Sequence, residues 1–270
     1  MILKGRKINW IATAVIFLLL FTGCSNSSGD KATVKDPASA NPKATLFAYV
    51  GAGLKDPVTE LAQTYEQRTG IKVEMTFNNS GALLSQLGTS KKGDVYMPGG
   101  MPFVQQAKQA GHVTDIVGPI AYHVPVIITP KGNPAKITKV QDLAKPGTKV
   151  VLPDKGATAI GQMAFKTFDK LGITKDVEKN VLAYVETAPK VITAITMGQG
   201  DVSIGEYSAV VNNKDKLEMI EIDPAVNEIE QIPCALVTYS TQKEETQKFI
   251  DFVAKEGPGV FAKYGFKTRL

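Results

Sequence analysis

The chain has 270 residues, of which 43% are hydrophobic and 21% charged, as in a folded protein of one large or two small domains. This composition excludes a wholly disordered, collagen-like or coiled-coil chain. The formal net charge of +5 falls to +2 when the first 23 residues are set aside, because 28 basic residues then face 26 acidic ones. Such a balance is not typical of a phosphate-backbone binder, so no nucleic-acid partner is expected.

The N-terminus has the pattern of a secretory signal. A short basic segment, 1–7, precedes a nearly continuous apolar run, 8–21, that is too short to span a membrane comfortably. Cys24 then follows a small residue, as in the lipobox of bacterial lipoproteins, which this segment resembles and in which the cysteine receives lipid. We therefore predict a signal peptide over 1–23 and a lipidated tether over 24–43, which place the protein outside the cytoplasm on a membrane. An uncut signal anchor is the alternative.

Only one other cysteine is present, so a lipidated Cys24 leaves no partner for an intramolecular disulfide. This second thiol, Cys234, has apolar neighbours on both sides. That context favours a buried structural cysteine over a nucleophile.

From residue 44 onward, apolar runs alternate with segments of helical periodicity. The first half is predicted to contain a strand over 45–50, a helix from Asp56 to Gly70, an alternating strand over 71–77, a helix over 82–87, a strand over 95–97 and a helix over 101–110. The second half is predicted to contain strands over 149–152, 182–186, 202–206 and 217–222, and helices over 160–171, 191–197 and 243–263. Alternating strands and helices indicate an α/β fold.

Two long extended stretches, 122–129 and 228–239, divide the folded part into a front, a middle and a back. We expect the front and back to share one lobe and the middle to form the other, joined by two crossings. The predicted domains are therefore lobe I over 44–124 and 234–270, and lobe II over 125–233.

Ligands of such folds bind beyond the carboxyl ends of strands, where loops lead into helix N-termini. The corresponding loops, 51–54, 78–81, 154–161, 186–190 and 206–208, are rich in small residues, amides and hydroxyls. Unpaired backbone N–H groups at helix starts favour an anion, although an ordinary capped turn is the alternative for any single loop.

Catalytic chemistry has little support in these loops. They carry no metal-ligand spacing and no good nucleophile-and-base pair, so neither an enzyme nor a free metal ion is expected; a secreted enzyme on the same scaffold is the rival class. The two histidines, His112 and His123, are expected to be structural or on the surface. Tyrosine ligation of ferric ion lacks the adjacent tyrosines and the carboxylate or histidine that it needs.

Several segments resemble the molybdate-binding proteins of bacterial ABC importers, over essentially all of 44–270. They are Leu46–Leu54, Met75–Gly81, Ser203–Tyr207 and Phe261–Phe266. The resemblance implies a two-lobed periplasmic-binding-protein fold of type II with two crossover segments. It also implies a monomer that needs no cofactor, captures a tetrahedral oxyanion by lobe closure and delivers it to an ABC permease and ATPase.

In that family two hydroxyl side chains, a tyrosine and backbone N–H groups hold the anion. By position, Ser80 matches the second hydroxyl and Tyr207 the tyrosine, whereas the first hydroxyl position is Gly53, which offers only its N–H. One second-lobe donor falls at Ile160, and the other falls on Pro189, which has no N–H. The implied oxyanion-binding residues are Gly53, Ser80, Gly81, Ala159, Ile160 and Tyr207, with Asn79, Thr187 and Lys190 as further candidates.

Molybdate or tungstate is the expected ligand, with sulfate, phosphate or chromate as alternatives. Phosphate needs an acceptor for its proton, which Glu206 or Asp154 provides if it faces the cleft. A lipid-anchored anion sensor is the alternative to a transporter subunit.

Overall fold

The computed structural model describes residues 44–270, so the predicted signal peptide, Cys24 and tether lie outside the described residues. The strands are β1 (Ala44–Gly51), β2 (Ile71–Asn78), β3 (Val95–Met97), β4 (Val113–His123), β5 (Pro125–Pro130), β6 (Val150–Pro153), β7 (Val181–Val185), β8 (Ser203–Glu206), β9 (Leu217–Glu221) and β10 (Glu230–Val237). The α-helices are α1 (Lys55–Thr69), α2 (Ser80–Ser90), α3 (Met101–Gln109), α4 (Ala159–Lys170), α5 (Thr174–Asn180), α6 (Ala188–Thr196), α7 (Tyr207–Val211) and α8 (Lys243–Lys263). Short 3₁₀ helices cover Ala52–Leu54 (η1) and Val140–Ala144 (η2).

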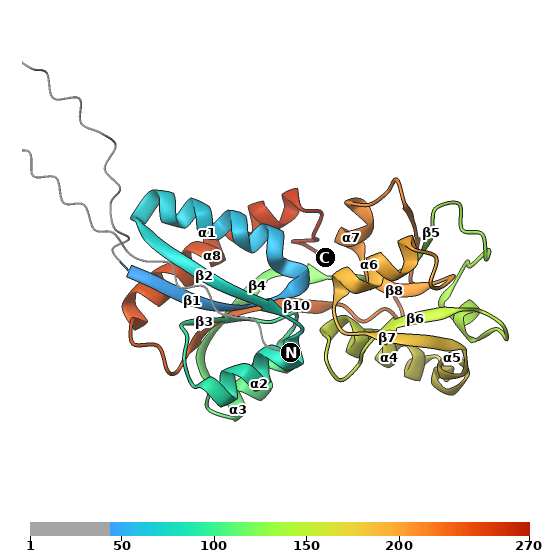
Figure 1. Ribbon diagram of the computed structural model, residues 1–270, viewed down its shortest axis with the longest axis horizontal. Coiled ribbons are helices and arrows are strands. Elements are labelled where there is room, and N and C mark those ends of the chain that lie inside the picture. Colours follow the sequence, from blue (N-terminus) through green and yellow to red (C-terminus); the bar gives the residue numbers. More distant parts are fainter. Residues whose placement is uncertain (1–43) are drawn as a thin grey trace, which may run out of the picture. The chain divides into compact units, whose positions relative to one another are not determined.

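A five-stranded sheet of order β2-β1-β3-β10-β4 defines what we call lobe I (Figure 1). β1 pairs in parallel with β2 and β3, and its register places Gly51 beside Asn78. Because parallel strands end at the same edge of a sheet, the loops after β1 and β2 lie next to each other. β10 runs antiparallel to β3 and β4.

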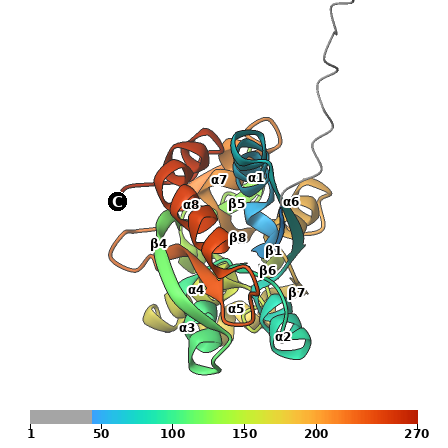
Figure 2. The same cartoon turned by 90° about the vertical axis from the view of Figure 1, so that its left-hand side faces the viewer.

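Helices cover both faces of this sheet (Figure 2). The apolar residues of α1 recur at helical spacing, and Val58, Leu61 and Tyr65 pack with Phe249 of α8 on one face. On the other face, α2 and α3 bury residues such as Leu83 and Val104. Lobe I therefore has two cores, one on each side of its sheet, which hold the loops at the strand ends in place.

The remaining strands form two smaller sheets, β8-β5-β9 and β6-β7, which define what we call lobe II. A single bridge between Val150 and Val202 joins them. Phe168 of α4 and Val177 of α5 contribute to one buried cluster, and Ile195 of α6 contributes to another. Lobe II is thus also covered by helices on both faces.

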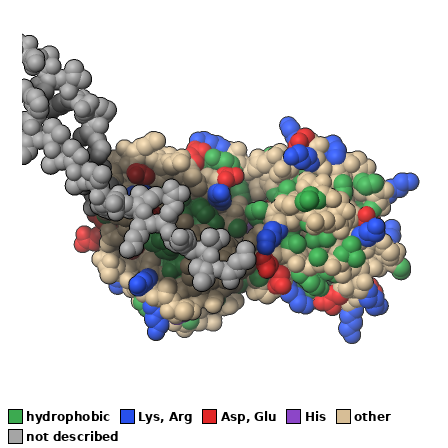
Figure 3. Space-filling model, in the orientation of Figure 1, with side chains coloured by type: hydrophobic (Ala, Val, Ile, Leu, Met, Phe, Trp, Pro, Cys, Tyr) green, Lys and Arg blue, Asp and Glu red, His purple; other side chains and the backbone are tan. Residues whose placement is uncertain are grey.

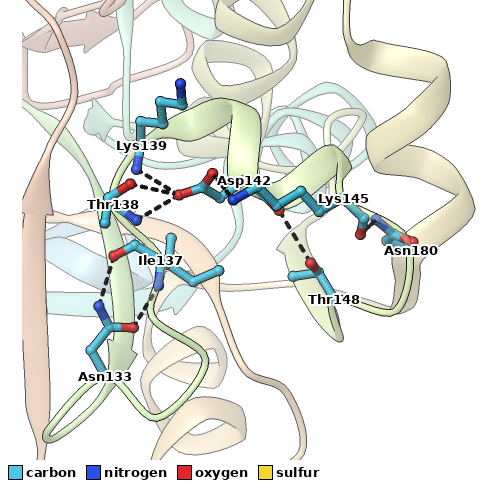
Figure 4. Close-up of polar contacts among 8 residues, drawn as sticks. All are labelled: Asn133, Ile137, Thr138, Lys139, Asp142, Lys145, Thr148 and Asn180. Carbon is cyan, nitrogen blue, oxygen red and sulfur yellow. Dashed lines mark hydrogen bonds and ion pairs between the residues drawn. The ribbon is translucent and has the colours of Figure 1, made fainter.

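One buried carboxylate ties together the start of lobe II. Asp142 is 1% exposed, and its Oδ2 accepts hydrogen bonds from Thr138 N, Thr138 Oγ1 and Lys139 N at 2.7–3.1 Å (Figure 4). Its Oδ1 lies 2.8 Å from Lys145 Nζ. Burial alone raises the pKa of this carboxyl, but the hydrogen bonds from Lys145, Thr138 and Lys139 outweigh it and hold the pKa well below its ordinary value.

Two crossings join the lobes. β4 ends at His123 and β5 begins at Pro125, while β9 ends at Glu221 and β10 begins at Glu230. The predicted two-lobed α/β fold with two crossover segments is therefore confirmed. β10 pairs with β4 from its first residue, so residues 230–233 belong to the sheet of lobe I, whereas we predicted them in lobe II.

The surface agrees with the charge balance of the sequence. Figure 3 shows Lys and Arg side chains interspersed with Asp and Glu on the visible face of lobe II. Within residues 44–270, no helix is both long enough and apolar enough to cross a membrane. The second cysteine, Cys234, lies fully buried in β10, and burial raises the pKa of its thiol to about 12, as expected for a structural cysteine.

Candidate oxyanion-binding cleft

A small cavity of about 40 Å³ lies where loops of the two lobes meet. On the scale at which one water molecule needs about 10–15 Å³, this is room for a ligand of a few heavy atoms. Its lining comes from the loops after β1, β2 and β3, from the ends of β4 and β8, and from the starts of α4 and α6. The lining residues are Gly51, Ala52, Gly53, Leu54, Asn78, Asn79, Ser80, Gly99, His123, Thr158, Ala159, Ile160, Thr187, Ala188 and Glu206.

Ser80, the first residue of α2, presents a hydroxyl at the cavity. Its side chain is 4% exposed, and its Oγ accepts a hydrogen bond from Gly99 N at 3.0 Å. Because the oxygen accepts, the hydroxyl proton stays available for a ligand. Asn79 caps the same helix through its Oδ1, which accepts from Ala82 N at 2.7 Å. The capped helix thus holds Ser80 with the positive end of the helix dipole facing the cavity.

The N-terminus of α4 supplies the lobe II side. Thr158 caps this helix: its Oγ1 accepts from Gly161 N at 2.9 Å and donates to Asp154 O at 2.8 Å. The single proton of the threonine hydroxyl is therefore already used and is not available to an anion. The N–H groups of Ala159 and Ile160 precede the first intrahelical hydrogen bonds and have no acceptor among residues 44–270. These two groups are free to bind an anion at the cavity.

The start of α6 explains how the site tolerates a proline. Ala188 is the first residue of the helix and Pro189 the second, where a missing N–H breaks no intrahelical hydrogen bond. Thr187 precedes the helix, and its hydroxyl caps no backbone group. Thr187 and Ala188 line the cavity, whereas Pro189 does not. This turn therefore brings one hydroxyl and one N–H to the cavity.

A histidine and a glutamate complete the lining. His123 and Glu206 are 6% and 4% exposed, and His123 Nδ1 lies 2.5 Å from Glu206 Oε1. His123 is the last residue of β4, just before the first crossing, and Glu206 is the last residue of β8, which pairs with β5 so that Glu206 lies opposite Pro125. We predicted His123 to be structural or on the surface, and the structure places it at the cavity. No Lys or Arg lines the cavity among the described residues.

The predicted site residues divide into two groups. Gly53, Ser80, Ala159 and Ile160, together with the further candidates Asn79 and Thr187, line the cavity. Gly81, Tyr207 and Lys190 lie outside the lining.

Each residue outside the lining has another partner. Gly81 N donates to Ala157 O at 3.0 Å, and Lys190 Nζ lies 2.6 Å from Glu186 Oε2 on the exposed side of α6. The ring of Tyr207 lies under Lys267 Nζ, 4.3 Å from the ring centroid. Asp154, one of the two possible proton acceptors, instead accepts from the backbone N–H groups of the 156–157 turn.

The two lobes touch around the cavity. Besides the hydrogen bond from Gly81 to Ala157, a cluster of Phe103 from lobe I with Ile160 and Met163 from α4 buries apolar surface across the cleft. A Cβ on Gly53 would lie 3.5 Å from the Cβ of Ala188. The structure therefore has the lobes closed over the site, and the small cavity volume follows from this closure. The described residues contain no group of three or more His, Cys, Asp or Glu that would hold a metal ion.

A cleft between two α/β lobes, lined by hydroxyls and free N–H groups, can hold a small solute. Residues 46–267 match the family model of the bacterial extracellular solute-binding proteins, and the chain belongs to this family. It is a family of extracytoplasmic solute-binding proteins, not of enzymes.

Individual relatives differ in the ligand that their names give. A Haemophilus influenzae protein, named only as a binding protein, is 30% identical over 83% of this chain and 91% of its own. The molybdate-binding protein ModA of Mycobacterium tuberculosis is 23% identical over 95% of this chain and 98% of its own. The solved structure of the sulfate-binding protein SubI from Mycobacterium tuberculosis superposes with a TM-score of 0.74 at 17% identity, covering 83% of this chain and 86% of that one.

Proposed function

We propose that this protein captures a tetrahedral oxyanion, molybdate or tungstate, between its two lobes and delivers it to an ABC permease and its ATPase. The family supports a solute-binding role. The relative that is named as molybdate-binding supports the choice of ligand. The proposal goes further than both, because it names the ligand and the partners.

The observation that carries the proposal is the set of donors around one small cavity. The N-termini of α2, α4 and α6 all open on it, and they bring the hydroxyls of Ser80 and Thr187 and the N–H groups of Ala159 and Ile160. An ion whose oxygens only accept hydrogen bonds, such as molybdate, matches a site made of donors. In a closed, dry cleft these charge-assisted hydrogen bonds replace the hydration of the anion.

Size and charge add to this argument. The cavity of about 40 Å³ has room for a small ion. With no Lys or Arg in the described lining, the positive ends of the helix dipoles provide the positive potential. Gly53 contributes its N–H, as the resemblance implies.

Hydrogen phosphate is the second candidate ligand, and the position of Glu206 in the cavity wall favours it. This carboxylate is buried in the cavity wall, and a protonated oxyanion can donate a hydrogen bond to it. Fully deprotonated ions cannot do so. Sulfate and chromate share the charge and shape of molybdate but not the proton of phosphate.

Calorimetric titration of the purified protein with molybdate, tungstate, sulfate, phosphate and chromate tests the proposal. We expect the tightest binding for molybdate or tungstate. Tighter binding of phosphate than of molybdate would favour the second candidate. If none of the five ions binds, the oxyanion proposal is wrong.

Membrane attachment through Cys24 belongs to the same proposal, as do the permease and ATPase partners and a monomeric state. Metabolic labelling with a radioactive fatty acid tests the anchor: Cys24→Ala is expected to abolish incorporation. A permease and an ATPase encoded beside this protein would support a transporter subunit. Their absence beside a receptor would favour an anion sensor.

A further inference from the structure

The buried pair of His123 and Glu206 has no role in the donor set that the sequence predicts. His123 Nε2 is buried and has no hydrogen-bond partner among residues 44–270; Nδ1 has none there either, and its one polar neighbour is Glu206 Oε1, with which it forms an ion pair. Unpaired buried polar atoms are rare in folded proteins, and one in the wall of a binding cavity points to a ligand. The residue is 6% exposed and lines the cavity, so it is buried by the protein yet adjacent to the site.

The position of Nε2 can be fixed relative to Ser80. A Cβ built on Gly99 would lie 3.2 Å from Ser80 Oγ and 3.6 Å from His123 Nε2. Both atoms therefore flank the same point of the chain at the cavity. Ser80 Oγ already accepts a hydrogen bond from Gly99 N, so the hydroxyl proton of Ser80 remains to be donated. This proton and His123 Nε2 face the same small volume of the cavity.

Glu206 determines which ring nitrogen remains for the ligand. Its Oε1 lies 2.5 Å from Nδ1, and a carboxylate beside one ring nitrogen favours a proton there. A neutral ring with its proton on Nδ1 would turn the lone pair of Nε2 towards an anion, which is repulsive. An imidazolium instead donates from Nε2 while Glu206 balances its charge.

Other groups around the ring do not take over this role. Phe266 packs edge-to-face against the imidazole. Glu230 of β10 lies opposite His123 in the sheet of lobe I, and burial raises the pKa of its carboxyl. The remaining charged group in the cavity lining is Glu206 itself.

We propose that His123 is an anion-binding residue of the cleft, which donates from Nε2 to the bound oxyanion as an imidazolium oriented by Glu206. This proposal rests on the proposed oxyanion-binding function and adds to it the one cationic group of the site. Glu206 acts as the positioning residue for the ring. The bound anion then contacts the neutral donors of the helix N-termini and one fully charged group, the imidazolium of His123.

Affinity is the first test. The variants His123→Gln and His123→Leu are titrated calorimetrically with molybdate and with any other of the five oxyanions that binds the parent protein. Each variant is expected to lose about 10- to 100-fold in affinity, the usual effect of removing one hydrogen bond to a charged group. His112→Gln is the matched control, because His112 lies away from the cleft with its Nδ1 2.8 Å from Tyr239 Oη. It is expected to bind like the parent.

The protonation state of the ring is the second test, and its first measurement is made on the parent protein without any substitution. Nitrogen NMR of histidine-labelled protein resolves two side chains, since the chain has two histidines. Saturating anion is expected to shift Nε2 of His123 and leave both ring nitrogens protonated. In Glu206→Gln the shift of Nε2 that the anion causes is expected to be smaller, because the carboxylate that orients the ring is gone.

The outcomes separate the two proposals. If no oxyanion binds the parent protein, both proposals fail together. If an oxyanion binds the parent and folded His123→Gln equally well, only the role of His123 is overturned. An Nε2 signal that saturating anion leaves unchanged overturns it too.

Discussion

Replacing Ser80 by alanine is the sharpest test of the donor set. Ser80 lines the cavity, and its Oγ accepts a hydrogen bond from Gly99 N at 3.0 Å. The hydroxyl of Ser80 can therefore donate its own hydrogen bond to a bound anion. A hydrogen bond to a charged partner contributes about 1.5–3 kcal/mol. We therefore expect Ser80→Ala to weaken oxyanion binding by about 10- to 150-fold at 25 °C.

Calorimetry measures this loss, and urea denaturation separates it from an effect on folding. Gly99 N loses its acceptor in the variant, so the free energy of unfolding without ligand is expected to fall by about 1 kcal/mol. Ser85→Ala is the matched control, because Ser85 lies on the exposed side of the same helix. Unchanged affinity in Ser80→Ala would refute the assignment of this hydroxyl to the site.

Three further changes test closure, the second hydroxyl and the core of lobe II. Gly81→Ala is expected to weaken binding by about tenfold, since its Cβ would lie 3.3 Å from Ala157 Cα and hinder closure; small-angle scattering should show the more open form, and equal compaction with ligand would contradict this. Thr187→Val keeps the side-chain volume and removes the hydroxyl, so calorimetry is expected to show a loss of about 10-fold or more; parent-like affinity would exclude it from the site. Asp142→Asn is expected to lower the free energy of unfolding by about 2–4 kcal/mol at neutral pH in urea titrations. Because folding lowers the pKa of Asp142, its carboxylate contributes fully to the free energy of unfolding above its unfolded pKa of about 3.9, and this contribution decreases as the pH falls towards the folded pKa. A difference in unfolding free energy between parent and variant that stays constant from pH 7 to pH 3 would contradict the assignment.

Most of the fold was predictable because its signals are local. Helical spacing and end signals gave α1 from Asp56 to Gly70, and the structure ends this helix on Gly70 in the left-handed conformation. The short helices α5 and α7 escaped prediction, since 7 and 5 residues are too few to show a period. Both depend on packing against the rest of lobe II.

The site was predictable as far as it is built from helix N-termini. Ser80 and the 159–160 turn follow predicted strands and precede predicted helices, so topology alone brings them to one edge. Lys190 and Tyr207 could not be placed in this way, because the direction of a side chain depends on its partners. Lys190 follows Glu186 by four residues and pairs with it, and Tyr207 packs under Lys267.

His123 was missed for a related reason. Its neighbours at the cavity, Ser80, Gly99 and Glu206, come from segments far apart in the chain, and no spacing in the sequence connects them. The one available signal was a polar residue at the end of an apolar crossing strand. Such a residue is buried only when a partner or a ligand satisfies it.

A crystal structure of the protein saturated with the tightest-binding of the five oxyanions tests the central claim most directly. The account predicts a single anion between the lobes, with oxygens within hydrogen-bond distance of Ser80 Oγ and of the N–H groups of Ala159 and Ile160. An anion bound elsewhere on the molecule, with this cavity empty, would contradict it.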